Sequence, residues 1–261
     1  MFVNERYSII LDHINRKGSV LVSELVEELH TSTETIRRDL IYLEKENHLQ
    51  RVHGGAIALS NMNKYPSLLQ RLNENKEQKE QISKIAALLV KEGDIIAIDA
   101  GSSAVEFVHT LKRNFKRLTI ITHSVKNFEM LKGMDGFRVI LIGGEYLAKE
   151  DMFYGLLALE TIQKLHVSKL FLFPSAISLK YGVGDFIPEA VAIQKAYIEI
   201  ADRVVIMADS SKYEKTALLK VCNTNTSYIY ISSDDLDENI CKTYKNNNIL
   251  LYKSEKELFD E

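Results

Sequence analysis

Cysteine is scarce in this sequence, with only Cys222 and Cys241 among 261 residues. Two thiols cannot form a disulfide framework, and these two do not have the spacing of metal ligands. This excludes a disulfide-stabilised fold and a cysteine-based metal site. We expect both thiols to stay reduced in a cytosol, and we expect neither a metal nor another cofactor.

Long apolar runs and a targeting segment are also missing. No run approaches the roughly 18 residues that a membrane helix needs, and the N-terminus lacks the basic-then-apolar order of a signal peptide. The formal net charge of -3 argues against a protein that coats nucleic acid nonspecifically. A small local basic patch stays compatible with that charge. We therefore expect a soluble, cytoplasmic protein with no membrane partner.

The length is natural for two domains, and an apolar content of 46% is enough for a core in each. A polar stretch that contains Pro66 and is rich in Asn, Glu, Gln and Lys has the composition of a boundary. We predict a first domain at 1–59, a partly helical linker at 60–81 and a second domain at 82–261.

Three helical patterns and a hairpin make up the first domain. The helices are expected at 4–17, at 23–29 and from Thr33 onward, with a short extended segment at 19–21. Thr31 and Ser32 compete as the cap of the third helix. Helix, short strand, helix, turn, helix and hairpin is the order of a winged helix-turn-helix.

The third helix is amphipathic. Its period of 3.6 places two sets on opposite faces: Ile36, Leu40 and Leu43, against Glu34, Arg38, Ile41 and Lys45. A helix with arginines on its free side can enter a DNA major groove, although such a face is also a common solvated surface. Gly54 and Gly55 suit a tight hairpin turn, which places Arg51 and His53 near a phosphate backbone.

The segment Thr35 to Leu40, with Leu43-Glu44 and the run Arg51 to Ala56, resembles the DNA-binding signature of DeoR-type bacterial repressors. The resemblance implies that six residues lie at or near DNA: Ser32, Thr33, Thr35, Arg37, Arg38 and Lys45. Helix geometry makes Arg38 and Lys45 the most outward, whereas Arg37 is flanking and could pair with a carboxylate. Asn47 stands where the family usually has glycine, and asparagine also accepts the left-handed conformation.

The second domain alternates apolar runs with helical segments. The runs are 95–98, 118–121, 137–142, 170–173, 204–207, 228–231 and 249–252, and the helical segments are 103–112, 124–132, 156–165, 189–201 and 235–245. Continuous apolar strands with helical crossovers predict an α/β domain with a mostly parallel sheet covered on both faces. Ligands of such sheets bind at the carboxyl ends of the strands.

Several of these strands end in residues that suit an anionic ligand. The ends read Asp99 to Ser103, Thr122 to Ser124, Gly143 to Glu145 and Asp209 to Lys212. Serine hydroxyls, glycines and free amides at a helix start can hold a phosphate. Each loop alone is a weak indication of a ligand site, because serine and glycine are common in turns. Several such loops at one sheet edge together predict a pocket for an anionic small molecule.

These strand ends also resemble the DeoR-type sensor domain, which is similar in fold to ribose-5-phosphate isomerase and glucosamine-6-phosphate deaminase. The resemblance implies a phosphorylated sugar as effector. The implied effector-binding residues are Asp99, Gly101, Ser102, Ser103, Thr122, Ser124, Gly143, Gly144, Asp185, Asp209 and Lys212. Among them Gly101, Ser102 and Ser103 would hold phosphate, Lys212 would supply positive charge, and Asp99 and Asp209 would accept sugar hydroxyls.

The chain departs from that pattern where the family holds its ligand. The loop after the fourth strand contains Phe173, Pro174 and Ala176 in place of a glycine-containing sequence, and His123 replaces a usual asparagine. Asp185 follows a glycine where threonine is usual. The identity of the effector depends on these positions.

An enzyme, either a sugar-phosphate isomerase or a deaminase, is the alternative reading. It would need a general base among Asp99, Glu145, Asp185, Glu189 and Asp209, and no pairing in the sequence singles one out. A DNA-binding architectural protein without ligand is a third reading. We interpret the chain as a non-enzymatic transcriptional regulator, a repressor of a sugar-utilisation operon that binds double-stranded operator DNA as a homo-oligomer.

Overall fold

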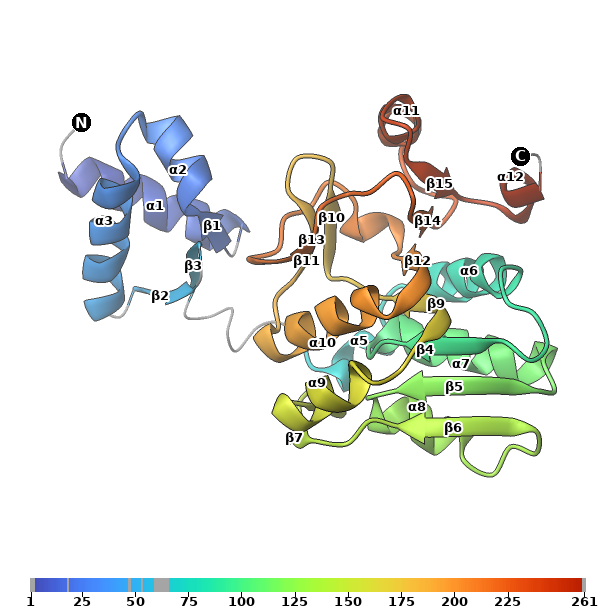
Figure 1. Ribbon diagram of the computed structural model, residues 1–261. Coiled ribbons are helices and arrows are strands. Elements are labelled where there is room, and N and C mark those ends of the chain that lie inside the picture. The colour runs from blue at the N-terminus through green and yellow to red at the C-terminus, as the bar shows by residue number, and fades with distance from the viewer. Residues whose placement is uncertain (1–2, 18, 47, 53, 59–65, 260–261) are drawn as a thin grey trace. The chain divides into compact units, whose positions relative to one another are not determined.

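The computed structural model describes residues 3–17, 19–46, 48–52, 54–58 and 66–259 (Figure 1). The chain forms two compact units, Met1–Pro66 with Ala217–Leu219, and Ser67–Thr216 with Lys220–Glu261. The sequence-based statements about Asn47 and His53 lie outside the described residues. Among the helices described, none is both long and apolar enough to span a bilayer.

The smaller unit is the predicted winged helix-turn-helix. Its elements are α1 (Val3–Lys17), β1 (Ser19–Leu21), α2 (Val22–Leu29), α3 (Thr33–Lys45), β2 (Leu49–Val52) and β3 (Gly55–Ala58). The strands pair antiparallel in the order β1-β3-β2. The apolar stripes of the helices meet over this sheet in one core, made by Ile10, Ile14, Val20, Leu25, Ile36, Leu40, Leu43, Leu49 and Ala56.

Local chemistry sets the turns of this unit. His30 ends α2 in the left-handed conformation, and Ser32 caps α3 by accepting the backbone N–H of Thr35 on its Oγ at 3.1 Å. Gly54 has a φ of +89°, whereas Gly55 pairs with Val52 in β3. A Cβ on Gly55 would lie 2.0 Å from the carbonyl oxygen of Val20, so the neighbouring strand requires glycine there. The turn therefore precedes Gly55, one residue earlier than the sequence suggested.

A seven-stranded sheet organises the larger unit, in the order β15-β14-β12-β9-β4-β5-β6 (Figure 1). All six strand pairs are parallel. The strands are β4 (Ile95–Ile98), β5 (Leu118–Thr122), β6 (Phe137–Leu141), β9 (Val167–Leu172), β12 (Ala201–Met207), β14 (Ile229–Ile231) and β15 (Leu250–Tyr252). Each predicted apolar run forms one of them, which confirms the predicted fold class.

Helices cover both faces of this sheet. They are α5 (Leu68–Arg71), α6 (Lys76–Ala87), α7 (Ser102–Asn114), α8 (Val125–Leu131), α9 (Leu156–Ile162), α10 (Pro188–Glu199), α11 (Glu238–Asn246) and α12 (Glu255–Phe259). Residues of α6 and α7 share a core with alternate strand residues such as Val205 and Met207. Helix α10 packs on β9 and β12 from the other side (Figure 1).

The strand order reverses between β4 and β9. From β4 the chain proceeds to β5 and β6 in one direction, and from β9 to β12, β14 and β15 in the other. The carboxyl ends of two strands at such a reversal border a crevice in which α/β proteins bind ligands. Asp99 directly follows β4 and Phe173 directly follows β9, so both belong to this crevice.

Smaller elements surround the same edge. Strands β7 (Glu145–Leu147) and β8 (Met152–Tyr154) form a hairpin, and β10 (Ala176–Ser178), β11 (Gly182–Asp185) and β13 (Leu219–Cys222) form a second small sheet. Residues 176–178, which we read as part of a loop, are therefore a buried strand. Residues 67–81, which we placed in the linker, lie in the larger unit and contribute α5 and the start of α6.

Candidate DNA-binding surface and effector site

The outer face of α3 carries Arg38. Its side chain is 78% exposed, and its Nε lies 3.5 Å from Oε1 of Glu34, one turn earlier. An exposed pair at this spacing contributes less than about 0.5 kcal/mol, so the guanidinium can exchange Glu34 for a nucleic-acid partner. Ile41 and Lys45 are exposed on the same face.

A hollow lies between α3 and the β2–β3 hairpin. Arg37 and Arg51 line it, together with Val22, Leu40, Val52, Gly54 and Gly55. Arg51 is anchored to Glu44 through Nε at 2.8 Å and through its backbone N–H at 2.7 Å, and these bonds lower the pKa of Glu44. Within the described part of the chain no carboxylate pairs with Arg37. Arg37 is thus the cation of this hollow that can accept an outside anion.

The remaining predicted DNA residues lie at the start of α3. Thr33 is exposed in the first turn. The hydroxyl groups of Ser32 and Thr35 form a hydrogen bond with each other, with the two oxygens 2.8 Å apart. The cap therefore orders the turn that precedes the helix, and Thr33 is the exposed residue of this group whose hydroxyl is not part of the cap.

Sequence reasoning missed what holds α3 in place. Arg6 of α1 forms two hydrogen bonds with Asp39, Nε to Oδ2 at 2.7 Å and Nη2 to Oδ1 at 3.0 Å, and both side chains are largely buried. Beside them Tyr7 stacks on Tyr42 with ring centroids 4.9 Å apart. These contacts attach the inner flank of α3 to α1, so that Arg38 next to Asp39 points outward from a fixed helix.

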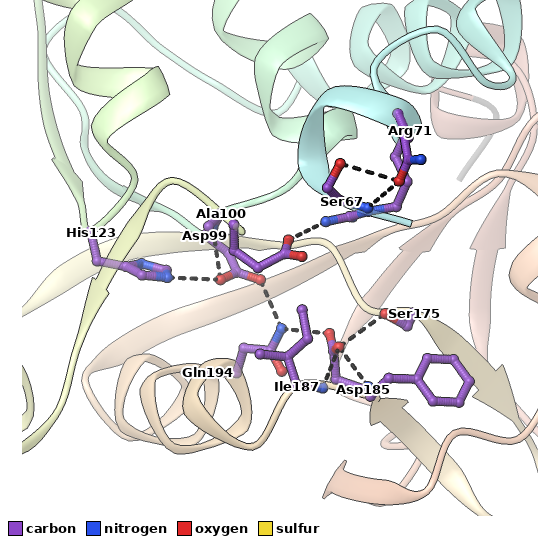
Figure 2. Close-up of polar contacts among 12 residues, drawn as sticks. Ser67, Arg71, Asp99, Ala100, His123, Ser175, Asp185, Ile187 and Gln194 are labelled. Atoms are coloured by element: carbon purple, nitrogen blue, oxygen red, sulfur yellow. Dashed lines mark hydrogen bonds and ion pairs between the residues drawn. The ribbon is translucent and has the colours of Figure 1, made fainter. Parts of the chain in front are cut away.

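Asp99 forms the centre of the polar cluster at the carboxyl edge of the larger sheet (Figure 2). It is completely buried, and Oδ1 accepts the backbone N–H of Ala100 at 2.8 Å. Oδ2 accepts Nε2 of Gln194 at 3.0 Å and the backbone N–H of Phe173 at 3.3 Å. Burial raises the pKa of Asp99 to about 7. The carboxyl group therefore changes its charge near neutral pH.

Gln194 of α10 joins Asp99 to a second buried carboxyl group. The same Nε2 donates to Oδ2 of Asp185 at 3.1 Å, and Oδ1 of Asp185 accepts Oγ of Ser175 at 2.9 Å and the backbone N–H of Phe186 at 2.7 Å (Figure 2). Burial also raises the pKa of Asp185. The strands β4 and β11 thus bring two predicted effector residues to one amide.

His123 and Tyr197 leave polar atoms unsatisfied beside this cluster. Nε2 of His123 lies 3.7 Å from Oδ1 of Asp99, which is too long for a hydrogen bond. Within the described residues, both ring nitrogens of His123, the Tyr197 hydroxyl and Oε1 of Gln194 are buried without a hydrogen-bond partner. Burial lowers the pKa of His123 to about 3, so the ring is neutral. Such atoms cost free energy until a polar ligand group reaches them.

Two predicted effector residues are used inside their own loop. Ser124 caps α8 by accepting the backbone N–H of Asn127 at 3.2 Å, and Oγ1 of Thr122 accepts the backbone N–H of Ser124 at 3.2 Å. Asn127 then donates Nδ2 to the backbone oxygen of Asp99 at 3.1 Å. Thr122 and Ser124 therefore shape the loop around Asp99.

The start of α7 is open to an anion. Gly101 precedes the helix with a φ of +139°, and its N-terminal N–H groups have no side-chain cap. A 13-residue helix carries partial positive charge at such an end. Ser102 is buried and Ser103 is half-buried beside these amides. Gly143 and Gly144 are exposed in the loop after β6.

Asp209 and Lys212 follow β12 at the same carboxyl edge. Oδ1 of Asp209 accepts the backbone N–H of Ser211 at 3.0 Å and Nδ2 of Asn75 at 3.2 Å. Lys212 is half-buried at the end of a short 3-10 helix, Ser210–Lys212. Nearby, the buried Lys79 donates Nζ to the backbone oxygen of Glu74 at 2.5 Å, and burial lowers its pKa.

Helical spacing in the sequence could have identified two residues of this edge that we did not predict, Lys79 and Gln194. Lys79 lies at helical spacing from Ile82, Ser83 and Ala86, all of which are buried, so an amphipathic reading of α6 would have placed it inward. Gln194 had a weaker signal of the same kind on α10. No local pattern indicates the ion pair between Arg71 and Glu150, which are 79 residues apart.

Two family models together match most of the chain. A model of the DeoR-like helix-turn-helix domain matches residues 6–62, and a model of the DeoR C terminal sensor domain matches residues 74–234. Ribose 5-phosphate isomerase A from Methanocaldococcus jannaschii aligns with a TM-score of 0.40 and 16% identity over 54% of this chain and 55% of that one.

Three relatives align over nearly the whole chain. The uncharacterised HTH-type regulator YulB of Bacillus subtilis is 34% identical over 91% of both proteins. The L-fucose operon activator of Haemophilus influenzae is 29% identical, over 95% of this chain and 99% of its own length. The HTH-type transcriptional repressor GlcR of Bacillus subtilis is 27% identical over 98% of both. With a DNA-binding module followed by a sensor module, this chain belongs to the DeoR family of transcriptional regulators and not to the isomerases or deaminases.

Proposed function

We propose that this protein represses a sugar-utilisation operon in the cytoplasm and that a phosphorylated sugar, bound by the larger unit, releases it from operator DNA. The observation that carries this function is the combination of two outward arginines on α3, Arg37 and Arg38, with a buried polar cluster at the strand reversal of the second unit. The relative named as an L-fucose operon activator supports regulation of a sugar operon, and the relative named as the transcriptional repressor GlcR supports repression.

On the DNA side, α3 enters the major groove and the β2–β3 hairpin follows the phosphate backbone. Arg38 and Lys45 face the groove, and Arg37 in the hollow takes a phosphate beside the anchored Arg51. Thr33 adds a hydroxyl at the helix start. Two copies reading half-sites about one DNA turn apart, or a multiple of it, explain the expected homo-oligomer and predict a two-fold operator.

On the effector side, the phosphate binds at the start of α7 through Gly101, Ser102 and Ser103, where free amides and a partial positive charge suit an anion. Lys212 adds a full charge. The carboxyl groups of Asp99, Asp185 and Asp209 accept sugar hydroxyls. The loops with Thr122, Ser124, Gly143 and Gly144 shape the surroundings. The effector can shift operator binding only by the difference in its affinity for the two states.

The experiment has two stages. Purified protein first selects fragments from its own genomic DNA, and the enriched sequence is used to measure operator affinity. A thermal-shift screen with glucose 6-phosphate, fructose 6-phosphate, ribose 5-phosphate and the unphosphorylated sugars then identifies effectors, because binding stabilises the folded state by mass action. Stabilisation by a phosphorylated sugar, with loss of operator binding, is expected. Turnover of that sugar would contradict the regulator-only function.

A further inference from the structure

The segment from Ser67 to Lys79 contains α5 and the start of α6, and it contacts the loops that carry the effector residues. Figure 2 draws Ser67 and Arg71 in the same close-up as Asp99 and Asp185. Arg71 pairs with Glu150, whose pKa is raised by burial and by the nearby charge of Asp185. Ser67 caps α5, where its backbone N–H donates to Oε1 of Gln70 at 2.8 Å. We call residues 67–79 the strap. Pro66, directly before it, ends the N-terminal segment of the DNA-binding unit.

Two sets of contacts attach the strap to the rest of the larger unit, and a third lies within the strap. Arg71 forms a buried ion pair with Glu150 of the β7–β8 turn, and the backbone N–H of Leu68 donates to the oxygen of Lys149 at 3.2 Å. Asn75 donates Nδ2 to Asp209 at 3.2 Å and to Oγ of Ser211 at 3.4 Å. Lys79 donates to the backbone oxygens of Arg71 and Glu74, which closes the strap on itself.

The strap uses a group that the effector needs. Oδ1 of Asp209 already serves Ser211 and Asn75, so a sugar hydroxyl on that oxygen would compete with Asn75. The other polar groups of the site are buried: these are the carboxyl groups of Asp99 and Asp185 and the unsatisfied atoms of His123 and Tyr197. A ligand reaches these groups only if something at this edge moves. The strap is attached there by polar contacts and by the buried side chain of Leu68, and it contains no strand of the main sheet.

We infer that the strap is the covering element of the effector site, and that its release by a phosphorylated sugar is the signal passed to the DNA-binding unit. This rests on the proposed function and assigns its regulation. The attached strap is the operator-binding state. The effector displaces Asn75 from Asp209, and the strap detaches. The residues that follow Pro66 are then no longer held against the larger unit. Weakening the strap without effector should therefore imitate induction.

Asn75→Gly is the sharpest test, because Asn75 has a φ of +48° and glycine keeps that conformation while removing both side-chain bonds. Asn248→Gly is the matched control, since Asn248 is exposed with a φ of +58° outside the site. Losing these two hydrogen bonds makes detachment of the strap about five times more favourable, so operator binding without any effector should weaken by up to about fivefold in Asn75→Gly. Amide hydrogen exchange across 67–75 should accelerate by a similar factor. Asn248→Gly should match the wild type in both measurements.

The outcomes separate this inference from the function it rests on. Equal operator affinity for Asn75→Gly and wild type, with unchanged exchange in the strap, would overturn the strap as transmitter even if a sugar phosphate still induces. If Asn75→Gly fails to fold, Ser211→Ala replaces it, because Ser211 is exposed and accepts from the same Asn75 amide. Failure of the wild type to bind any genomic fragment would instead refute the proposed repressor.

Discussion

Replacing Arg38 by alanine should separate DNA binding from stability. The Arg38 side chain is 78% exposed and its one ion pair, with Glu34, spans 3.5 Å. Losing an exposed pair at this spacing costs about 0.3–0.5 kcal/mol, and the better helix propensity of alanine offsets part of that. The melting temperature of the smaller unit should therefore fall by no more than a few degrees.

The cost to operator binding should be far larger. A bidentate arginine contact with a base contributes about 1–3 kcal/mol, and a two-fold operator contains the contact twice. The loss of about 2–6 kcal/mol corresponds to a complex weaker by about 30-fold to about 20,000-fold. If Arg38 contacts a phosphate instead, the loss is smaller and the slope of log affinity against log salt decreases by about 1 per reader.

Gel shift or fluorescence anisotropy at several salt concentrations gives both quantities. Arg113→Ala is the control, because Arg113 is an exposed arginine in the last turn of α7 in the other unit. It removes the same charge and should leave operator affinity within twofold. Wild-type affinity in Arg38→Ala would refute the assignment of α3 as the reading helix.

Three further variants test the other parts. Asp39→Ala leaves the buried guanidinium of Arg6 without its partner, so the free energy of unfolding of the smaller unit should fall by about 3 kcal/mol. The double variant Arg6→Met with Asp39→Leu should recover most of that loss in thermal melts. If the effects of Arg6→Met and Asp39→Leu were additive, the two residues would not act as a pair. Ser102→Ala with Ser103→Ala should weaken induction by the sugar phosphate and leave operator affinity unchanged, and an identical induction curve would remove the α7 start from the site. Asp99 has a folded-state pKa of about 7, above its ordinary 3.8, so it binds a proton on folding; its stabilising contribution is complete below pH 3.8 and lost as pH rises to 7. The free energy of unfolding of Asp99→Asn relative to wild type should thus increase by about 2–3 kcal/mol from pH 5 to pH 8, and a difference independent of pH would contradict the raised pKa.

The strands of the larger unit were predictable because both faces of a parallel sheet are covered. The buried run Ile96 to Ile98 must then be apolar at every position, and such a run can be recognised from its own sequence alone. The stripe of α3 is equally local, since Ile36, Leu40 and Leu43 repeat at the helical period. In both cases the burial of one segment alone determines the pattern.

The contacts that make the site were not predictable because they join residues that are far apart in the sequence. Gln194 meets Asp99 across 95 residues, and Arg6 meets Asp39 across 33, so neither has a sequence neighbour that indicates the pairing. Gly55 was read as a turn residue, although the requirement for glycine there comes from the carbonyl of Val20 on another strand. Local spacing identifies a conformational preference and does not reveal which distant group enforces it.

Operator affinity of the wild-type protein, measured with and without the sugar phosphate that most raises its melting temperature, tests the central claim most directly. We predict tight binding to a two-fold genomic site and at least a tenfold loss at saturating sugar phosphate, with no effect of the unphosphorylated sugar. An affinity for that site that stays constant while the sugar phosphate demonstrably binds would contradict a repressor controlled from the strand reversal of its second unit.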